Sequence, residues 1–340
     1  MEIEIEHDIQ QRIFNSIQLQ LPKGEKLSNI LQEKLHISQD AAYRRLRGDV
    51  PLTIYETKIL CEAYKLSFDD YGEIKPGKVQ FNYNPLVSID MNYKSYLQGL
   101  RDNLALLRQL EDVEMIITVN DTPLFQIFNL PHVTRFKFFF WAKTYLQMPE
   151  YKDEKFKREK IDKESLSIGI EALNYYNSIP TTEIYGPETL RGTLRQLEYY
   201  FDSHLFEDPS YILEILDNLM QLIDHMRTEA EKGVKFTRGN EAPGSGNDFN
   251  MYKNDTYIAD NTYLIRWKTG STVYISHNIL NYLVTEDPFY ADETEKVVTK
   301  LRDNSSLISK VNAKERNQFF GNLERTVTNF RRKVEAELDF

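Results

Sequence analysis

Residues 37–48, with the sequence ISQDAAYRRLRG, constrain the fold of this chain more than any other stretch. Ser38 precedes a helical pattern, and its side chain can accept a hydrogen bond from a free backbone N–H of the first turn. Ala42 and Leu46 lie four residues apart, so they share one face of that helix. Gly48 then supplies a residue that tolerates the positive φ common at helix ends. The stretch therefore predicts a short helix with one apolar side and arginines around it.

A second helical pattern precedes this one. Its apolar residues recur at helical spacing and form one stripe: Leu27, Ile30, Leu31 and Leu35. Residues 36–38 then fit a short turn between the two helices, which together predict a helix-turn-helix. After Gly48, Thr53 is expected to cap a further helix, and residues 66–71 (LSFDDY) indicate another capped helical turn.

This order of residues resembles the BetR-type branch of the lambda-repressor-like, or XRE-like, bacterial DNA-binding domains. The resemblance covers residues 7–72 and is carried by residues 43–48 (YRRLRG), 52–53 (LT) and 66–69 (LSFD). Two positions depart from the usual pattern. Gln32 stands where alanine normally lets the two helices approach, which leaves their crossing open. His36 stands where glycine commonly makes the turn, but histidine tolerates left-handed backbone, so we expect the turn to form.

The resemblance implies that the second helix of the pair enters the major groove of double-stranded DNA. The expected contacts are the residues that face outward from it: Ser38, Gln39, Asp40, Tyr43, Arg44 and Arg47. Because the first turns of such a helix go deepest into the groove, we expect Gln39 and Arg44 at base edges, and Tyr43 and Arg47 mainly at phosphates. The alternative is a helical hairpin with surface arginines and no ligand.

The charge of the whole chain does not decide between these two interpretations. Lys and Arg number 42 against 52 Asp and Glu, which gives a net charge of −10. Attraction to phosphate is screened beyond roughly 8–10 Å at working salt, so the local balance matters more. Residues 39–48 hold three arginines and one aspartate before Asp49. The acidic remainder argues against an RNA-coat or chromatin-type binder, which would spread basic charge along the chain.

A length of 340 residues predicts two or three domains. We expect a helix-turn-helix domain in residues 1–72, a linker in 73–92, and a regulatory and dimerisation domain in 93–340 with a subdivision near 233–250. The N-terminus lacks an apolar signal region, and no run approaches the ~20 apolar residues of a membrane span, so we expect a cytoplasmic protein without a membrane partner. Cys61 is the single cysteine, which excludes an intrachain disulfide and a thiolate metal cluster.

The sequence predicts a mainly α fold, in which the larger domain is helical with a small antiparallel β-sheet. Helical spacing marks most of residues 93–226, including an aromatic helix that follows Pro131. Strands are expected at residues 113–119, 124–128, 249–252, 256–259, 263–267 and 272–276. Closing helices are expected from about His277, Asp292 and Ala313.

The last of these helices carries apolar residues at a and d spacing: Phe320, Leu323, Val327, Phe330 and Val334. The stripe covers about two heptads, short of the three to four typical of a coiled coil. It either packs on its own domain or forms a dimer seam. A single XRE-like unit reads only a few base pairs, so we expect a homodimer on a two-fold site.

The larger region lacks the phosphate-binding, dinucleotide-binding, zinc-protease and nucleophile-elbow motifs, and we expect neither an enzyme nor a cofactor. His204 and His225 could meet across consecutive helices, but solvated histidines without a metal are expected. Asp287 and Asp292 are interpreted as a loop cap. The chain has 21 Tyr and 19 Phe, which suit a large core and pockets for small ligands. The candidates for a pocket wall are Tyr175, Tyr176, Tyr199, Tyr200 and Phe201.

These observations together favour a one-component transcriptional regulator with a domain that senses a small-molecule effector. A rival hypothesis is an enzyme or nucleotide-signal sensor that carries a DNA-binding head. A third is an interaction scaffold whose head binds protein.

Overall fold

The computed structural model describes residues 2–338 except residues 23, 69–70, 72–77, 84–92, 245–247, 257, 259 and 279, and it describes side chains from residue 9 onward. The chain divides into two compact units, residues 1–80 and 81–340, and each has its own apolar core. Most of the expected linker in residues 73–92 lies outside the described residues. Residues 233–250 lie within the larger unit.

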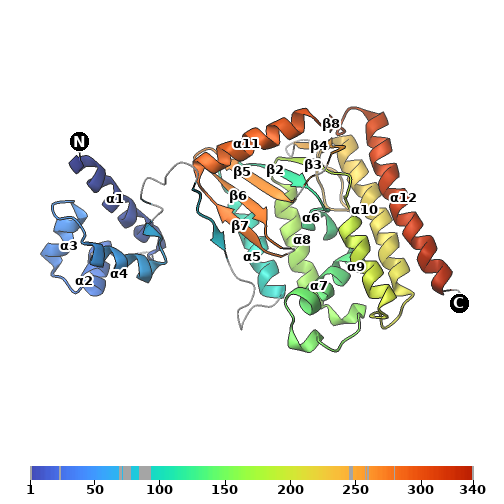
Figure 1. The fold of residues 1–340 in the computed structure, drawn as a ribbon, viewed down its shortest axis with the longest axis horizontal. Coiled ribbons are helices and arrows are strands. Elements are labelled where there is room, and N and C mark those ends of the chain that lie inside the picture. Colours follow the sequence, from blue (N-terminus) through green and yellow to red (C-terminus); the bar gives the residue numbers. More distant parts are fainter. Residues whose placement is uncertain are drawn as a thin grey trace. The chain divides into compact units, whose positions relative to one another are not determined.

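The described part of the N-terminal unit contains four helices (Figure 1): α1 (Glu2–Gln20), α2 (Leu27–Leu35), α3 (Gln39–Leu46) and α4 (Ile54–Tyr64). The helical turn expected in residues 66–71 falls partly outside the described residues. Its buried core combines residues from all four helices: Ile13, Phe14, Ile17, Leu31, Ala42, Leu60 and Tyr71. Leu31 and Ala42 are both fully buried, so α2 and α3 pack together although Gln32 is larger than the alanine expected there. The Gln32 amide instead donates to the carbonyl of Ser28 within its own helix, at 3.1 Å.

Local backbone chemistry produces the helix-turn-helix as the sequence predicts. Ser38 is the N-cap of α3, and its Oγ accepts from the N–H of Ala41 at 3.3 Å. His36 adopts the left-handed conformation with φ 54°, which makes the turn between α2 and α3. Gly48 has φ 79°, beyond the end of α3. Thr53 caps α4.

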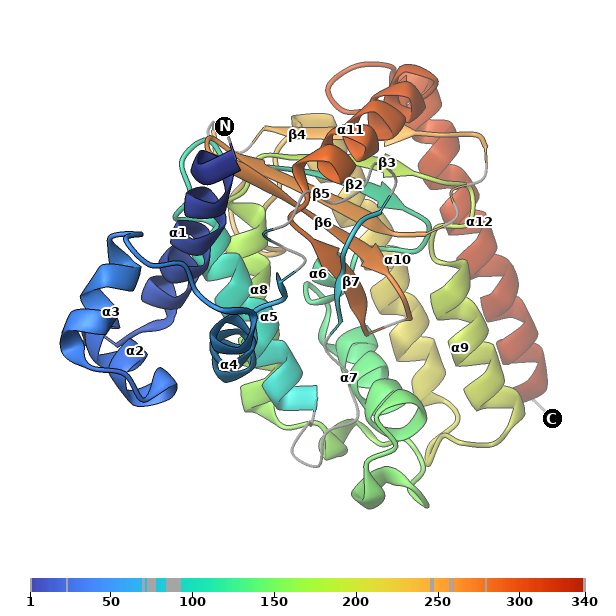
Figure 2. The same ribbon diagram turned by 60° about the vertical axis from the view of Figure 1, so that its left-hand side comes forward.

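The larger unit has an α/β fold, so the prediction of a mainly α class with a small antiparallel sheet is wrong. Eight strands form one mixed sheet in the order β1-β7-β6-β5-β2-β3-β4-β8 (Figure 2). β2, β3 and β4 run parallel to one another, while every other neighbouring pair is antiparallel. The strands are β1 (Asn82–Tyr83), β2 (Glu114–Val119), β3 (Thr181–Tyr185), β4 (Phe249–Lys253), β5 (Thr262–Trp267), β6 (Gly270–Ser276), β7 (Tyr282–Thr285) and β8 (Ser306–Leu307).

Helices cover both faces of this sheet, but unequally (Figures 1 and 2). Among the described helices of the larger unit, α11 (Pro288–Asp303) alone covers one face, and its buried Ala291 and Val298 belong to two small apolar clusters with strand residues. The opposite face carries α5 (Tyr93–Leu107), α6 (Leu124–Ile127), α7 (Pro131–Phe140), α8 (Lys163–Asn177), α9 (Arg191–Asp202), α10 (Tyr211–Lys232) and α12 (Ala313–Leu338). A π-helical turn (Trp141–Tyr145) continues α7, and two short 3-10 turns follow at Pro149–Tyr151 and Arg158–Lys160.

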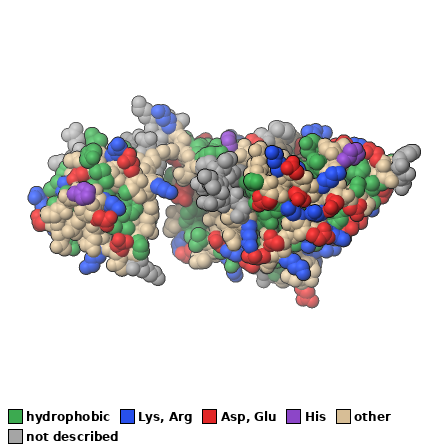
Figure 3. Space-filling model, turned by 90° about the horizontal axis from the view of Figure 1, so that it is seen from below, with side chains coloured by type: hydrophobic (Ala, Val, Ile, Leu, Met, Phe, Trp, Pro, Cys, Tyr) green, Lys and Arg blue, Asp and Glu red, His purple; other side chains and the backbone are tan. Residues whose placement is uncertain are grey.

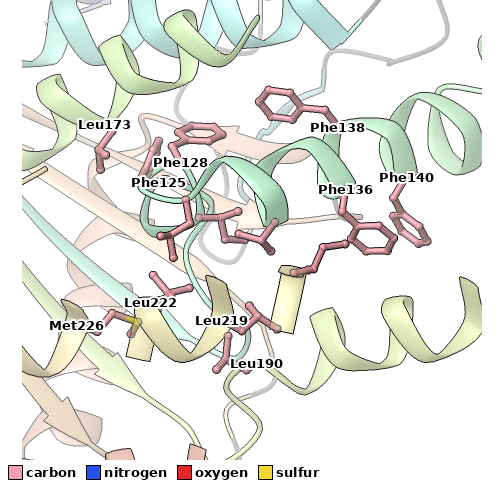
Figure 4. Close-up of a cluster of buried hydrophobic side chains, with 14 of the residues drawn as sticks. Phe125, Phe128, Phe136, Phe138, Phe140, Leu173, Leu190, Leu219, Leu222 and Met226 are labelled. Carbon is pink, nitrogen blue, oxygen red and sulfur yellow. The ribbon is translucent and has the colours of Figure 1, made fainter. Parts of the chain in front are cut away.

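The main core lies between the sheet and this helical layer, and α7 runs through it (Figure 4). As its aromatic composition predicts, α7 is buried on several sides, since Phe136, Phe138, Phe139 and Phe140 are all buried. The ring of Phe136 makes an edge contact with Tyr200, with 5.3 Å between centroids. Tyr176 and Tyr200 are both buried and belong to this core.

Several helices and strands differ from those that the sequence predicts. Residues 124–128 form α6 and a turn instead of a strand, because a short apolar run does not distinguish a buried helix from a strand. No helix begins near His277, since the chain there turns into β7. β3 is missed because it has five residues and carries the buried carboxyl group of Glu183. The described members of residues 256–259 lie outside any strand.

The apolar stripe of α12 packs within the larger unit. Phe320, Leu323, Val327 and Val334 are buried in the main core, where α12 lies against α10. Arg331 of α12 also pairs with Asp217 of α10. The stripe therefore stabilises its own domain and is not a free dimer seam.

Candidate nucleic-acid interface

The outward face of α3 is the candidate interface of the N-terminal unit. The structure places all six residues expected to contact DNA on the surface: Ser38, Gln39, Asp40, Tyr43, Arg44 and Arg47. Ser38 contributes a hydroxyl that is engaged in capping, so its effect on any ligand acts through the start of the helix. The first turn of α3 also exposes backbone N–H groups, which favour negative charge at a helix N-terminus.

The three arginines of α3 have three different environments. Arg45 points toward α4 and pairs with Glu56, with Nη2 and Oε1 2.7 Å apart. Burial opposes ionisation of Glu56, but hydrogen bonds from Thr53 and Arg45 hold its pKa below the usual value. Arg45 therefore joins α3 to α4, whereas Arg44 and Arg47 remain on the surface.

Arg44 and Arg47 differ in whether a carboxylate competes for them. Arg47 forms an exposed ion pair with Asp49, with Nε and Oδ2 2.9 Å apart. The guanidinium of Arg44 has neither an ion pair nor a hydrogen bond with any described residue. Arg44 is thus the cation on this face that can bind an anion without first leaving a protein partner.

Two glutamines of α1 fix the far end of α3. Gln10 is buried, and its amide nitrogen donates to the carbonyls of Arg45 at 2.7 Å and Val50 at 3.2 Å. Its amide oxygen accepts from the N–H of Leu52 at 2.6 Å. Gln11 donates to the carbonyl of Leu46 at 2.8 Å. These contacts hold the loop that follows α3, and no local pattern in the sequence signals them because the partners lie at least 35 residues away.

Charge is mixed over the N-terminal unit on the face drawn in Figure 3, where Lys and Arg side chains are interspersed with Asp and Glu. That face shows no broad basic surface. The exposed arginines of α3 and its C-cap that could attract nucleic-acid phosphates are Arg44 and Arg47.

The candidates of the larger unit have structural roles. Tyr176, Tyr200 and Phe201 are buried in the core, while Tyr199 is exposed and Tyr175 is partly buried. The two cavities described below are lined by other residues. The tyrosine pairs therefore give no pocket wall there.

The expected solvated histidines are confirmed only in part. His204 is exposed beyond the end of α9, but His225 is buried in α10, where its Nε2 lies 2.8 Å from the carbonyl oxygen of Phe236. Among the described residues, no three His, Cys, Asp or Glu side chains are grouped as metal ligands. Asp287 caps α11 by accepting from the N–H of Tyr290 at 2.8 Å, as the loop-cap interpretation predicts. Asp292 instead pairs with Arg266.

Comparison with known proteins finds no matching family model, no significantly similar curated protein and no significantly similar solved structure. Of the helices in the described part of the chain, none combines the length and apolar character needed to cross a membrane. Cys61 is buried in the N-terminal unit, which agrees with the expected core position.

Proposed function

We propose that this chain is a sequence-specific transcriptional regulator that acts in the cytoplasm and binds double-stranded DNA through α3. The observation that carries the proposal is that one side of this helix packs on the rest of the unit while the other side is exposed. Ala42 and Arg45 hold α3 to its neighbours, while Gln39, Tyr43 and Arg44 stand exposed on a helix of the right length to enter a major groove.

The side chains on this face suit distinct parts of DNA. Arg44 can donate two hydrogen bonds to the O6 and N7 atoms of a guanine. Gln39 can donate one hydrogen bond to N7 of an adenine and accept one from its N6 amino group. Tyr43 and Arg47 are expected to contact phosphates. Arg47 would exchange Asp49 for a phosphate at small cost, because exposed ion pairs contribute only about 0–1 kcal/mol.

A homodimer is part of this proposal, since two copies of α3 on a two-fold site would read enough base pairs for useful affinity. The larger unit would supply the dimer contacts and the response to an effector. Because the apolar stripe of α12 is buried within one chain, the dimer interface must lie on another surface of the protein.

Selection of bound fragments from random duplex DNA by the full chain tests this function. Recovery of a common two-fold motif, bound by the wild type and not by a variant with α3 residues Gln39 and Arg44 both changed to Ala, would support it. A full chain that enriches no motif would contradict it, and co-purification of a protein partner through the N-terminal unit would then favour the scaffold hypothesis.

A further inference from the structure

The larger unit contains a cavity of about 290 Å³ at the carboxyl end of β2. Its lining includes Asp121 and Thr122 from the loop after β2, Lys137 and Trp141 from α7 and the turn that continues it, and Gln196 from α9. In α/β folds, ligands bind outside the carboxyl ends of the parallel strands. The volume is at the small end of the roughly 300–1,000 Å³ typical of ligand pockets, which suits a small metabolite better than a nucleotide.

Lys137 is a buried cation in this cavity, with only 4 % of its surface exposed. Its Nζ donates to Oε1 of Gln196 at 2.8 Å, and it forms no ion pair with any described residue. Burial lowers the pKa of Lys137, although the nearby charge of Asp121 partly opposes that effect. A buried ammonium group with one neutral partner still has N–H groups to donate.

Two further polar groups of the lining are buried without a partner. The indole Nε1 of Trp141 and the hydroxyl of Thr122 form no hydrogen bond with any described residue. Trp141 follows Lys137 by one helical turn and begins the π-helical turn, a distortion often found at functional sites. Buried donors are normally paired, so an acceptor oxygen placed beside these groups would complete their hydrogen bonds.

A negative charge lies at a separate place in the same cavity. The carboxylate of Asp121 sits against the start of α9, where a Cβ added at Gly192 would be 2.5 Å from Oδ2. Gly192 and Gln196 are one turn apart on α9, so Asp121 and Lys137 approach the same helix at successive turns without pairing. Asn261 fixes the loop by accepting from the N–H of Asn120 at 2.7 Å and of Asp121 at 3.3 Å.

An apolar cavity of about 280 Å³ adjoins this one, since both are lined by Leu124, Tyr263 and Tyr282. Its other walls come mainly from α5 and the sheet, including Leu100 and Ile265. An apolar substituent of a ligand whose charged groups face Lys137 and Asp121 would lie toward these walls.

We propose that the two cavities together bind an α-amino acid with an apolar side chain, its carboxylate facing Lys137, Trp141 and Thr122 and its ammonium group facing Asp121. A zwitterion would neutralise the two separated charges and supply the missing acceptors. The role of this amino acid as an effector rests on the proposed function, whereas its binding to the two cavities does not.

The binding test uses the full chain and five probes: L-valine, L-leucine, L-isoleucine, L-methionine and L-phenylalanine. Calorimetric titration should detect at least one of them. For each amino acid that binds, the carboxamide and the acid without the amine should bind at least ten-fold more weakly, because each lacks one charge. Absence of binding by all five, or equal binding of the acid without the amine, would overturn the proposal.

Variants locate the site. Lys137→Met should fold, since an apolar chain replaces a buried ammonium, and should bind the amino acid at least ten-fold more weakly. Trp141→Phe keeps an aromatic ring but removes the indole N–H, so it should weaken binding of the amino acid several-fold. Lys300→Met, at an exposed lysine of α11 on the opposite face of the sheet, is the matched control and should bind like the wild type. Unchanged affinity in folded Lys137→Met would overturn the assignment.

A third measurement separates this inference from the proposed function. Titration of the selected duplex with and without the amino acid should show operator affinity changed by roughly 5- to 150-fold. A chain that binds the amino acid but no duplex would contradict the proposed function alone. A chain that binds the duplex but none of the probes would contradict the ligand site alone.

Discussion

Arg45 and Glu56 form an ion pair that joins α3 to the start of α4, and their side chains are 14 % and 13 % exposed. The same carboxylate accepts from the N–H of Thr53 at 2.9 Å through Oε2, while Thr53 Oγ1 accepts from the N–H of Glu56. One glutamate therefore completes the capping box of α4 and holds an arginine of the adjoining helix. The exposed face of α3 depends on this contact for its orientation.

Arg45→Ala should destabilise the N-terminal unit by about 1–3 kcal/mol, because it leaves a largely buried carboxylate short of a partner. Both tryptophans, Trp141 and Trp267, lie in the larger unit, so hydrogen exchange of residues 39–64 is the appropriate measurement. Asp49→Ala, which removes an exposed ion pair, should change the free energy of opening measured by hydrogen exchange by less than about 1 kcal/mol. Equal effects of the two variants would show that the Arg45–Glu56 pair has no special role.

Gln10→Leu should also destabilise the N-terminal unit, by about 2–4 kcal/mol, since it leaves two carbonyls and one N–H without their side-chain partner. Gln18→Leu, at an exposed position of the same helix, is the control. Urea unfolding followed by circular dichroism would compare the free energies of unfolding of the two variants. A Gln10 variant as stable as the control would contradict the supporting role of α1.

Arg44 and Arg47 should differ in how they affect DNA binding. Arg44→Ala should weaken DNA binding by ~1–3 kcal/mol and relax the base preference at one position of the site. Arg44→Lys should not retain that preference, because lysine cannot form the paired hydrogen bonds. Arg47→Ala should weaken binding to all sequences and reduce the slope of log affinity against log salt by about 1. Arg325→Ala on α12 is the control. Full specificity in Arg44→Ala would exclude this assignment of the base-reading residue.

Glu183 should make the stability of the larger unit depend on pH. Burial raises its pKa to about 7, although Lys235 and a hydrogen bond from Tyr185 act in the opposite direction. The folded state then holds the proton more tightly than the unfolded state, so the contribution of Glu183 to stability falls as pH rises from about 4.5 to 7.

Tryptophan fluorescence during guanidinium unfolding would measure this effect. The free energy of unfolding of the wild type, minus that of Glu183→Gln, should fall by up to about 3 kcal/mol between pH 5 and 7.5 and then level off. A difference independent of pH would mean that Glu183 is ionised throughout this range.

Val327→Glu should unfold the larger unit instead of only dissociating a dimer, because Val327 is buried between α12 and the rest of the core. Placing an unpaired charge there should cost more than about 4 kcal/mol. Thr326→Glu, at an exposed neighbouring position, should leave both fold and assembly unchanged in sedimentation and circular dichroism. A Val327→Glu variant that is folded but monomeric would show that the dimer interface includes α12.

The sequence by itself determined the parts of the structure that depend on a few adjacent residues. Ser38 and Thr53 cap helices through bonds that span three positions, and His36 and Gly48 accept positive φ through their own chemistry. The exposed side of α3 follows from helical spacing once Ala42 is placed inside. For this reason, the helix-turn-helix and the surface positions of its six candidate residues could be predicted without the fold.

Only the tertiary structure decided the rest, because the relevant contacts join distant residues. β2 and β3 pair in parallel across α6, α7 and α8, and the buried carboxyl group of Glu183 hides β3 from any apolar pattern. Gln10 meets its partners across at least 35 residues. The cavity brings Asp121, Lys137 and Gln196 together from three separate segments. Such placements depend on how the helices pack on the sheet, and spacing along the chain carries no information about that packing.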